Sequence, residues 1–167
     1  MARTADTLDE KIRARNIRII LDVATDVFSR KGFDGARIAE IADLAKLPKA
    51  NIYYYFSSKE EIYSTIITNL IVGWDEALSK LSVDRDPADA LRDYVRAKLI
   101  YARENPRESR LFASEIIHGA RFLSKKDRAH MRAATDKYVA VLDQWMQEGR
   151  MVKIDARHFF IMLWGAT

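Results

Sequence analysis

Apolar residues recur at spacings of three and four in one segment after another, and this helical period is the feature that most limits what the chain can fold into. In residues 16–33 the spacing is carried by six side chains, Ile17, Ile20, Leu21, Ala24, Val27 and Phe28. Gly32 then follows as an expected left-handed end of that helix. No segment shows the sustained polar–apolar alternation of a strand, and the only strand-like tetrapeptide is YYYF at 53–56. The sequence therefore predicts an all-α fold.

Two short helices are expected next, separated by a tight turn. The first buries a face made of Ile38, Ile41, Ala42 and Ala45. It should break near Pro48, because proline interrupts a helix but is tolerated in the first turn of the following one. The second short helix is then expected to reach Phe56. A pair of short helices around a tight turn is the helix-turn-helix arrangement, whose second helix enters the major groove of DNA.

Capping residues mark the starts of the longer helices that follow. Ser58 with Glu61 forms an expected capping box, and so does Ser124 with Asp127. Further starts are expected where a capping side chain stands before proline, at Asp86-Pro87 and Asn105-Pro106, and at Asp155. The helix that begins near Ser124 should stop at Gly149. These signals extend the helical organisation over the whole chain.

Composition excludes several classes of protein. The 167 residues are 49% hydrophobic, enough to bury a substantial core. There is no cysteine, which excludes a disulfide scaffold and a thiolate metal site. The start of the chain carries acids and bases, and the most apolar stretch, 159–166, is too short to cross a bilayer. The expected location is therefore the cytoplasm.

Positive charge is concentrated near the beginning of the chain. Residues 1–59 contain 11 Lys and Arg against 8 Asp and Glu, a net charge of +3, out of +4 for the whole chain. A basic run at Lys11, Arg13, Arg15 and Arg18 could contact DNA as an arm, although such a helix start is more often simply solvated. The bias favours nucleic acid over membrane as an anionic partner.

Three consecutive tyrosines at 53–55 cannot all face one core, because successive helical residues are turned by about 100°. If Ile52 and Phe56 mark the buried side, then Tyr54 and residues 49–51 face solvent or a partner. Phenolic hydroxyls and lysines in such a position can contact DNA phosphates. The alternative is that the tyrosines only pack this helix onto its neighbours.

The stretch GFDGARIAEIADLAKLPKANIYYYFSSKEEIY, residues 32–63, resembles the TetR family of transcriptional regulators. It has the family's Gly-aromatic pair, a short helix ending Ile-Ala-x-x-Ala, a recognition helix ending in a tyrosine-rich motif and Phe, and then Ser-Lys-Glu. The later helices resemble more loosely the branch of the family that regulates pyrimidine utilisation. The resemblance implies a three-helix DNA-binding domain at 1–57 and a helical effector-binding and dimerisation domain at 58–167.

The resemblance also implies a set of DNA-contacting positions. They are Arg37, Lys49, Ala50, Asn51, Tyr53, Tyr54, Tyr55 and Lys59. Lys49 is the best candidate for reading a base edge, because lysine can donate to guanine O6 and N7. Tyr53, Tyr55 and Lys59 fit positioning contacts, and Arg37 is a further phosphate candidate.

Three positions depart from the family pattern, and each bears on how the motif would dock on DNA. Ala36 stands where a capping threonine is usual, and Pro48 where a capping Ser or Thr is usual. Lys46 replaces the usual glycine of the turn and would have to adopt a left-handed conformation. The chain also ends inside the helix that begins near Asp155, before a further helix that family members usually have, so a truncated form is expected.

The C-terminal region is expected to sense a small molecule. The resemblance implies a repressor that binds a palindromic operator as a dimer and is released by a small-molecule effector, and the looser branch likeness implies a nucleobase-like metabolite. Polar residues among apolar ones suggest pocket positions, namely Trp74, Tyr101, Arg110, Phe112, Glu115, His118, Trp145 and Trp164. Each has a structural alternative, since tryptophans are usually core residues and a lone histidine usually satisfies a local polar group.

The sequence carries weaker signals for two other classes of function, an enzyme and a protein-interaction module. Glu115 and His118 form one E-x-x-H, but a di-iron site needs a second such motif and two more glutamates. No nucleophile motif or glycine-rich phosphate loop is present, so neither an enzyme nor a cofactor is expected. The remaining alternative is a helical protein-interaction module without DNA binding, which predicts no salt-dependent affinity for DNA.

Overall fold

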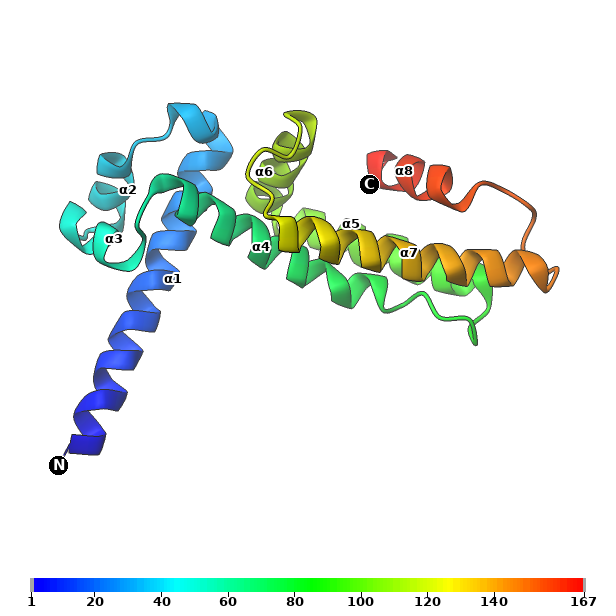
Figure 1. Cartoon of the computed structure of the whole chain (residues 1–167), viewed down its shortest axis with the longest axis horizontal. Helices are drawn as coiled ribbons and strands as arrows, with labels where there is room; N and C mark the ends of the chain where they lie inside the picture. The colour runs from blue at the N-terminus through cyan, green and yellow to red at the C-terminus, as the bar shows by residue number, and fades with distance from the viewer. Residues whose placement is uncertain (1, 167) are drawn as a thin grey trace. The chain divides into compact units, whose positions relative to one another are not determined.

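The computed structural model describes residues 2–166, with side chains at 9–74 and 78–166. Within this part of the chain there are eight helices and no strand (Figure 1). The helices are α1 (Ala2–Gly35), α2 (Ile38–Ala45), α3 (Lys49–Tyr55), α4 (Lys59–Leu78), α5 (Pro87–Glu104), α6 (Pro106–Ile117), α7 (Lys125–Gln147) and α8 (Ala156–Ala166). The all-α prediction is confirmed. No helix among the described residues is long and apolar enough to cross a membrane.

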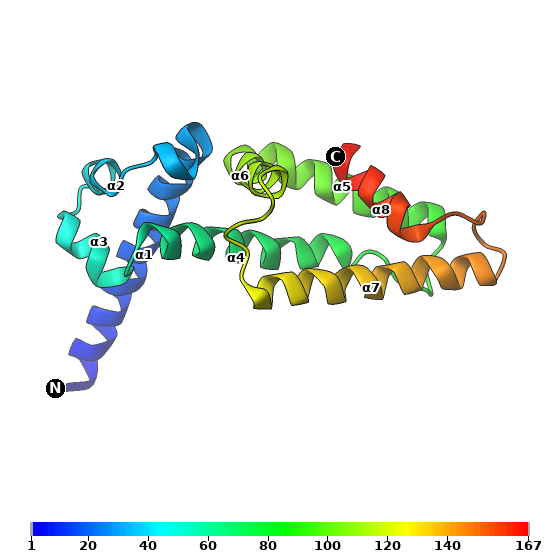
Figure 2. The same cartoon turned by 45° about the horizontal axis from the view of Figure 1, so that its top comes forward.

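The chain forms two compact units that each combine two separate segments. The first unit holds residues 1–67 and 107–122, and the second holds residues 68–106 and 123–167. Helix α4 contributes its first part to one unit and its second part to the other. Within the first unit, α2 and α3 lie beside α1 in both views, and within the second, α8 lies beside α7 (Figures 1 and 2).

The core of the first unit is built on the helical period of α1. Ile20, Ala24 and Val27 are completely buried and Phe28 almost so. Gly32 interrupts α1 with φ 69° and ψ 176°. The positive φ fits the expected helix end, but ψ is extended instead of left-handed, so the chain turns and then resumes helical structure up to Gly35.

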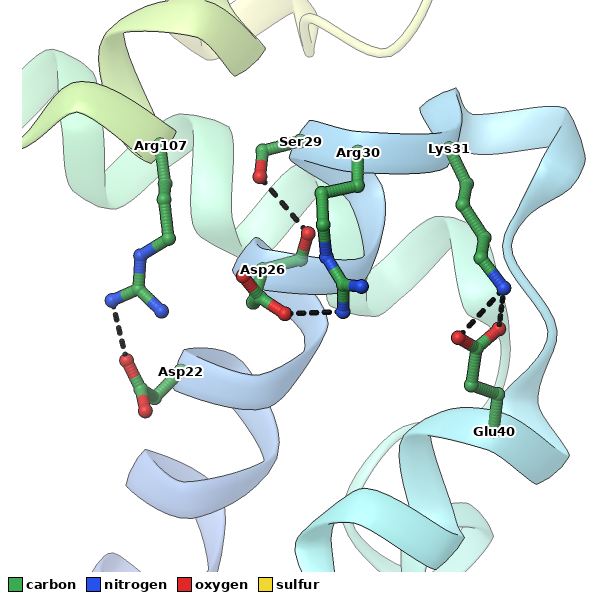
Figure 3. Close-up of polar contacts among 7 residues, drawn as sticks. All are labelled: Asp22, Asp26, Ser29, Arg30, Lys31, Glu40 and Arg107. Atoms are coloured by element: carbon green, nitrogen blue, oxygen red, sulfur yellow. Dashed lines mark hydrogen bonds and ion pairs between the residues drawn. The ribbon is translucent and has the colours of Figure 1, made fainter.

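Helix α6 packs with the N-terminal helices although it lies far along the chain. Arg107 at its start donates to the Asp22 carboxylate of α1 at 2.9 Å (Figure 3). After its end, the Phe122 ring stands 4.1 Å from that of Phe33 and 4.9 Å from that of Tyr63, measured between centroids. Aromatic pairs at these separations add stabilisation beyond their buried area. This cluster joins α1, α4 and the segment after α6.

The second unit has its own core around α7. Trp145, Leu142 and Phe160 are at most 1% exposed, and Tyr94 of α5 belongs to the same buried cluster. The Trp145 indole N–H donates to the carbonyl of Val83 at 3.1 Å, which satisfies the polar end of a completely buried ring. Burial raises the pKa of the Tyr94 phenol, whose oxygen accepts from the Trp164 indole at 2.8 Å.

The predicted caps are found at most helix ends. Asp86 accepts from the Asp89 N–H, and Ser124 with Asp127 forms a complete capping box at the start of α7. Gly149 has φ 70° just beyond the end of α7, and the Asp155 carboxylate accepts from the His158 N–H at 2.9 Å at the start of α8. These expectations are confirmed.

Two of the predicted caps differ in their partners. Ser58 accepts from the Glu61 N–H at 3.1 Å, but the Glu61 carboxylate returns to the N–H and hydroxyl of Ser57, both at 2.6 Å. Asn105 serves the end of α5, because its side-chain amide donates to the Tyr101 carbonyl at 3.1 Å. The Glu61 carboxylate thus binds the residue directly before the expected one, and the Asn105 amide binds a carbonyl one turn back in α5.

Candidate DNA-binding surface

The turn between α2 and α3 contains a residue in the left-handed conformation. Lys46 has φ 54° and ψ 40°, as predicted from its place where glycine is usual. Its N–H donates to the Asp43 carbonyl at 3.2 Å, and the Leu47 N–H donates to the Ala42 carbonyl at 3.1 Å. These are the paired bonds of a Schellman motif, which satisfies the last carbonyls of α2. The turn therefore forms without glycine, at the cost of strain at Lys46.

The starts of both short helices lack side-chain caps, as two of the departures from the family pattern predicted. The residue before α2 is Arg37 and the residue before α3 is Pro48, and neither provides a capping hydrogen bond. Ala36 is buried next to Arg37. Helix α2 is instead tied to α1 by the Lys31 ammonium, which lies 2.7 Å from one Glu40 carboxylate oxygen and 2.8 Å from the other (Figure 3).

Helix α3 presents opposite faces to the core and to solvent. Ile52 is completely buried and Phe56 is 6% exposed, so they mark the inner face as expected. Tyr54 is 72% exposed and Tyr53 is 48% exposed. Lys49 and Ala50 at the start of the helix are exposed, and Asn51 is half-buried. The outer face of α3 thus carries an ammonium group and two phenols that are open to a partner.

Contacts along the surface hold its cations and phenols in place. The Lys49 ammonium lies 5.8 Å from the centroid of the Tyr53 ring, within the range of a cation–π interaction. The Tyr55 hydroxyl accepts a hydrogen bond from the Asn16 amide of α1 at 3.0 Å. Sequence reasoning missed Asn16, and no local pattern could reveal a partner 39 residues away. Tyr55 is thereby fixed to α1 and only its outer part is accessible.

Lys59 at the start of α4 has partners within the first unit. Its ammonium donates to the carbonyls of Phe33 at 2.8 Å and Ala36 at 3.0 Å, and lies 4.3 Å from the centroid of the Phe33 ring. These bonds tie the end of α1 and the loop before α2 to the start of α4. The arrangement favours a role for Lys59 in positioning α2, beside the phosphate contact that the resemblance implies.

Four of the expected pocket residues lie on or beside α6 in the first unit. Arg110 and His118 are exposed, Phe112 is half-buried and Glu115 is 3% exposed. The ring Nδ1 of His118 lies within hydrogen-bond distance of the Ser114 carbonyl oxygen, at 2.7 Å. Among the side chains that the structure describes, no three His, Asp or Glu residues come together as metal ligands.

Glu115 has a clear structural partner. Its carboxylate accepts from the Phe122 N–H at 2.5 Å, and its carbonyl accepts from the Ala120 N–H at 2.7 Å. Burial, together with the neighbouring charge of Glu115 and a hydrogen bond to it, raises the pKa of the Tyr63 phenol. A buried carboxylate that accepts from a turn and from a phenol holds that turn closed. Glu115 therefore fixes the 118–122 turn onto α4.

The other four expected pocket residues lie in the second unit. Trp145 is completely buried in the core, and Trp164 is half-buried with its N–H bonded to Tyr94. Trp74 and Tyr101 are half-buried, with ring centroids 6.3 Å apart and planes at 80°. A β-carbon at Gly73 would lie 3.6 Å from the Tyr101 hydroxyl, an ordinary van der Waals distance, so this contact does not require glycine. Trp74 and Tyr101 thus form one edge-to-face aromatic pair of this unit.

Sequence reasoning missed an open groove of about 740 Å³ along α5. It is lined by Ala88, Leu91, Arg92, Val95, Arg96, Leu99, Ile100 and Arg103. None of the eight expected pocket residues lines it. Its signal in the sequence is the apolar period of three and four within 88–103, which by itself does not distinguish a groove from a covered face.

Comparisons with known proteins cover both halves of the chain. The family described as "Bacterial regulatory proteins, tetR family" matches residues 20–66, and "YcdC-like protein, C-terminal region" of the TetR type matches residues 67–167. The HTH-type transcriptional regulator RutR of Escherichia coli K12 is 35% identical over 150 residues, which cover 90% of this chain and 71% of RutR. The HTH-type transcriptional repressor NicS of Pseudomonas putida is 34% identical over 132 residues, covering 78% of this chain and 61% of NicS.

The fold is also similar to that of solved regulators. The structure of AibR in complex with isovaleryl coenzyme A and operator DNA superposes with a TM-score of 0.70 at 25% identity, covering 90% of this chain and 82% of AibR. The resemblance drawn from residues 32–63 is confirmed, and a regulator is favoured over a protein-interaction module without DNA binding. The chain belongs to the TetR family of bacterial regulatory proteins and is a transcriptional regulator of that family.

Proposed function

We propose that this regulator binds a palindromic operator as a homodimer through α2, the Lys46 turn and α3, and that a small-molecule effector releases it. The observation that carries the DNA part is the division of α3 into two faces. Ile52 anchors the helix in the core while Lys49, Tyr53 and Tyr54 stand on the open side. A helix held in this way can enter the major groove without losing its packing. Operator binding would place the protein in the cytoplasm with the chromosome.

Within this surface we propose distinct roles for the individual residues. Lys49 reads a base edge, because it is exposed at the start of α3, where a recognition helix meets the bases. Ala50 and Asn51 lie beside it and contribute close approach and a hydrogen bond. The phosphate and sugar contacts come from Arg37, Tyr53, Tyr54, Tyr55 and Lys59.

The effector part of the proposal concerns the region after the reading head. We assign residues 1–57 to DNA binding and residues 58–167 to effector binding and dimerisation, without catalysis or a cofactor. AibR, similar in fold, was solved with both isovaleryl coenzyme A and operator DNA. The likeness to RutR, with the expected link to pyrimidine utilisation, favours a nucleobase-like effector for this chain.

The eight candidate pocket residues do not support the effector proposal equally. Trp74 and Tyr101 support it best as stacking walls, because the two rings are half-buried and stand edge to face with centroids 6.3 Å apart. Arg110, Phe112 and His118 could supply polar and apolar contacts from α6. Glu115, Trp145 and Trp164 already have hydrogen-bond partners within the protein and would take part mainly by shaping the surroundings.

Selection of genomic fragments by the purified protein tests the DNA part. Retained fragments are sequenced at low and moderate salt, and we expect an inverted repeat whose half-sites lie about 34–36 Å apart, one turn of DNA. Lys49→Ala should then relax the preference at one base position in each half-site, by about 1–3 kcal/mol. Failure to retain DNA fragments above background at either salt concentration would support the protein-interaction module instead.

Titration of the enriched duplex with candidate effectors tests the second part. A ligand coupled to DNA binding by a typical 1–3 kcal/mol weakens operator affinity about 5- to 150-fold. Uracil, thymine and other nucleobases form the first panel, with acyl coenzyme A thioesters as the second. Release by the second panel only would overturn the nucleobase proposal while leaving the operator proposal intact.

A further inference from the structure

The N-terminal part of α1 runs past the exposed side of α3 and places an arginine on its tyrosines. The guanidinium carbon of Arg13 lies 5.8 Å from the centroid of the Tyr54 ring and 5.5 Å from that of the Tyr55 ring. The two rings are themselves 5.0 Å apart with their planes at 82°. Arg13 therefore stands over two phenols of the candidate DNA-binding surface at once.

A hydrogen bond one turn along α1 fixes this arrangement. Asn16 follows Arg13 by three residues, so both side chains lie on one face of α1. The Asn16 amide donates to the Tyr55 hydroxyl at 3.0 Å, which joins α1 to α3 beside the guanidinium. The position of Arg13 is thus set by contacts between α1 and α3.

The charge of Arg13 is available to a ligand. The residue is exposed, and none of the carboxylates that the structure describes forms an ion pair with it. In a cation–π contact the ring faces hold the guanidinium without accepting its hydrogen bonds, so its N–H donors still point to solvent. Arginine in this state suits phosphate, because its planar fork can donate two parallel hydrogen bonds to two oxygens.

We propose that Arg13 is a further phosphate-binding residue of the DNA-binding surface, presented by the Tyr54 and Tyr55 rings. The proposal rests on operator binding by α3 and adds a contact from α1 to it. The guanidinium and the Tyr54 hydroxyl would meet the same strand of the backbone next to the groove that α3 enters. Because a phosphate carries no base identity, this contact sets affinity and register and does not discriminate between sequences.

The slope of log K against log salt concentration measures this contact directly. Each phosphate neutralised on duplex DNA contributes about 0.9 to that slope. The probes are the inverted-repeat duplex obtained by genomic selection and a random-sequence duplex of equal length, both measured by fluorescence anisotropy with the full chain. The variants are Arg13→Ala and Arg13→Lys. The matched control is Arg30→Ala, which removes the same charge from the same helix where it is paired with Asp26.

We expect Arg13→Ala to lower the slope by about 0.9 per bound protomer on both duplexes alike. Arg13→Lys should keep the slope, because it keeps the charge, and Arg30→Ala should keep both slope and affinity. Thermal unfolding by circular dichroism checks that each variant folds, as expected for exposed positions.

Three results would count against the proposal. A wild-type slope for Arg13→Ala, even with weaker binding, would mean that Arg13 only supports the packing of α3. A loss confined to duplexes rich in A·T pairs would mean a minor-groove contact with bases in place of the phosphate contact. Absence of binding by the wild-type chain to either duplex would overturn the operator proposal itself, and is thereby distinguished from the first two results.

Discussion

Replacing Glu115 by alanine should destabilise the first unit strongly, because its carboxylate serves two donors at a 3% exposed position. It accepts from the Phe122 N–H at 2.5 Å and from the Tyr63 hydroxyl. A hydrogen bond to a charged group is worth about 1.5–3 kcal/mol, and its loss leaves the donor without a partner. We therefore expect Glu115→Ala to lower the free energy of unfolding by about 3–5 kcal/mol.

Glu115→Gln is the matched variant, because glutamine has nearly the same volume and keeps one acceptor oxygen. We expect it to cost about 1–2 kcal/mol, the difference between charged and neutral acceptors. Denaturant unfolding followed by far-UV circular dichroism gives both values. Hydrogen exchange at the Phe122 amide supplies the local readout, since this amide should lose protection in Glu115→Ala and keep most of it in Glu115→Gln.

The reasoning is refuted if Glu115→Ala costs less than about 0.5 kcal/mol, the range of ordinary surface substitutions, and leaves exchange at the Phe122 amide unchanged. The same variants also separate the two roles considered for this residue. An effector-pocket carboxylate would change the response to effector at unchanged stability, whereas a carboxylate that holds the 118–122 turn changes stability first.

Three further predictions concern other local features. Lys46→Gly should raise the free energy of unfolding by about 0.5–1 kcal/mol, because it removes the left-handed strain at φ 54°. This figure is the net gain, since the greater backbone entropy of glycine in the unfolded state offsets part of the relief. Thermal unfolding measures the change. Ser124→Ala should lower it by about 1 kcal/mol through loss of the capping box of α7, as read from the urea midpoint. Burial raises the pKa of the Tyr63 and Tyr94 phenols above the ordinary value of 10.0, so the folded state keeps protons that the unfolded state releases. Stability should then fall as pH rises above about 10, by about 1.4 kcal/mol per pH unit for each tyrosine, and Tyr63→Phe should flatten that fall in urea titrations between about pH 9 and 11.

The α2–α3 region could be predicted closely because its determinants are local. The buried side of α3 follows from Ile52 and Phe56, four residues apart, and the left-handed Lys46 follows from its place in a turn that usually has glycine. Helix periods, Schellman turns and caps involve residues within about five positions of one another, so a single sequence contains nearly all of the information they need.

The partners of Lys59, Glu115 and Tyr55 could not be predicted in the same way. Sequence patterns identified each as a candidate for DNA or effector contact, yet the structure gives Lys59 two carbonyls 26 and 23 residues away and gives Tyr55 an amide 39 residues away. Glu115 accepts from the nearby Phe122 N–H only because a turn with positive φ at Gly119 and Ala120 brings that donor back, and its other donor, the Tyr63 hydroxyl, comes from α4. A polar side chain on a helix is compatible with many partners until packing selects one.

The sequence by itself determined the helices, their main caps and the face that α3 turns to solvent, because these depend on hydrophobic period and on bonds within one or two turns. Only the tertiary structure decided that residues 107–122 pack with the N-terminal helices and that Arg13 stands over Tyr54 and Tyr55. Those outcomes depend on which apolar faces bury each other across long separations in the chain. Burial is a collective property of the packed helices, so no local spacing encodes it.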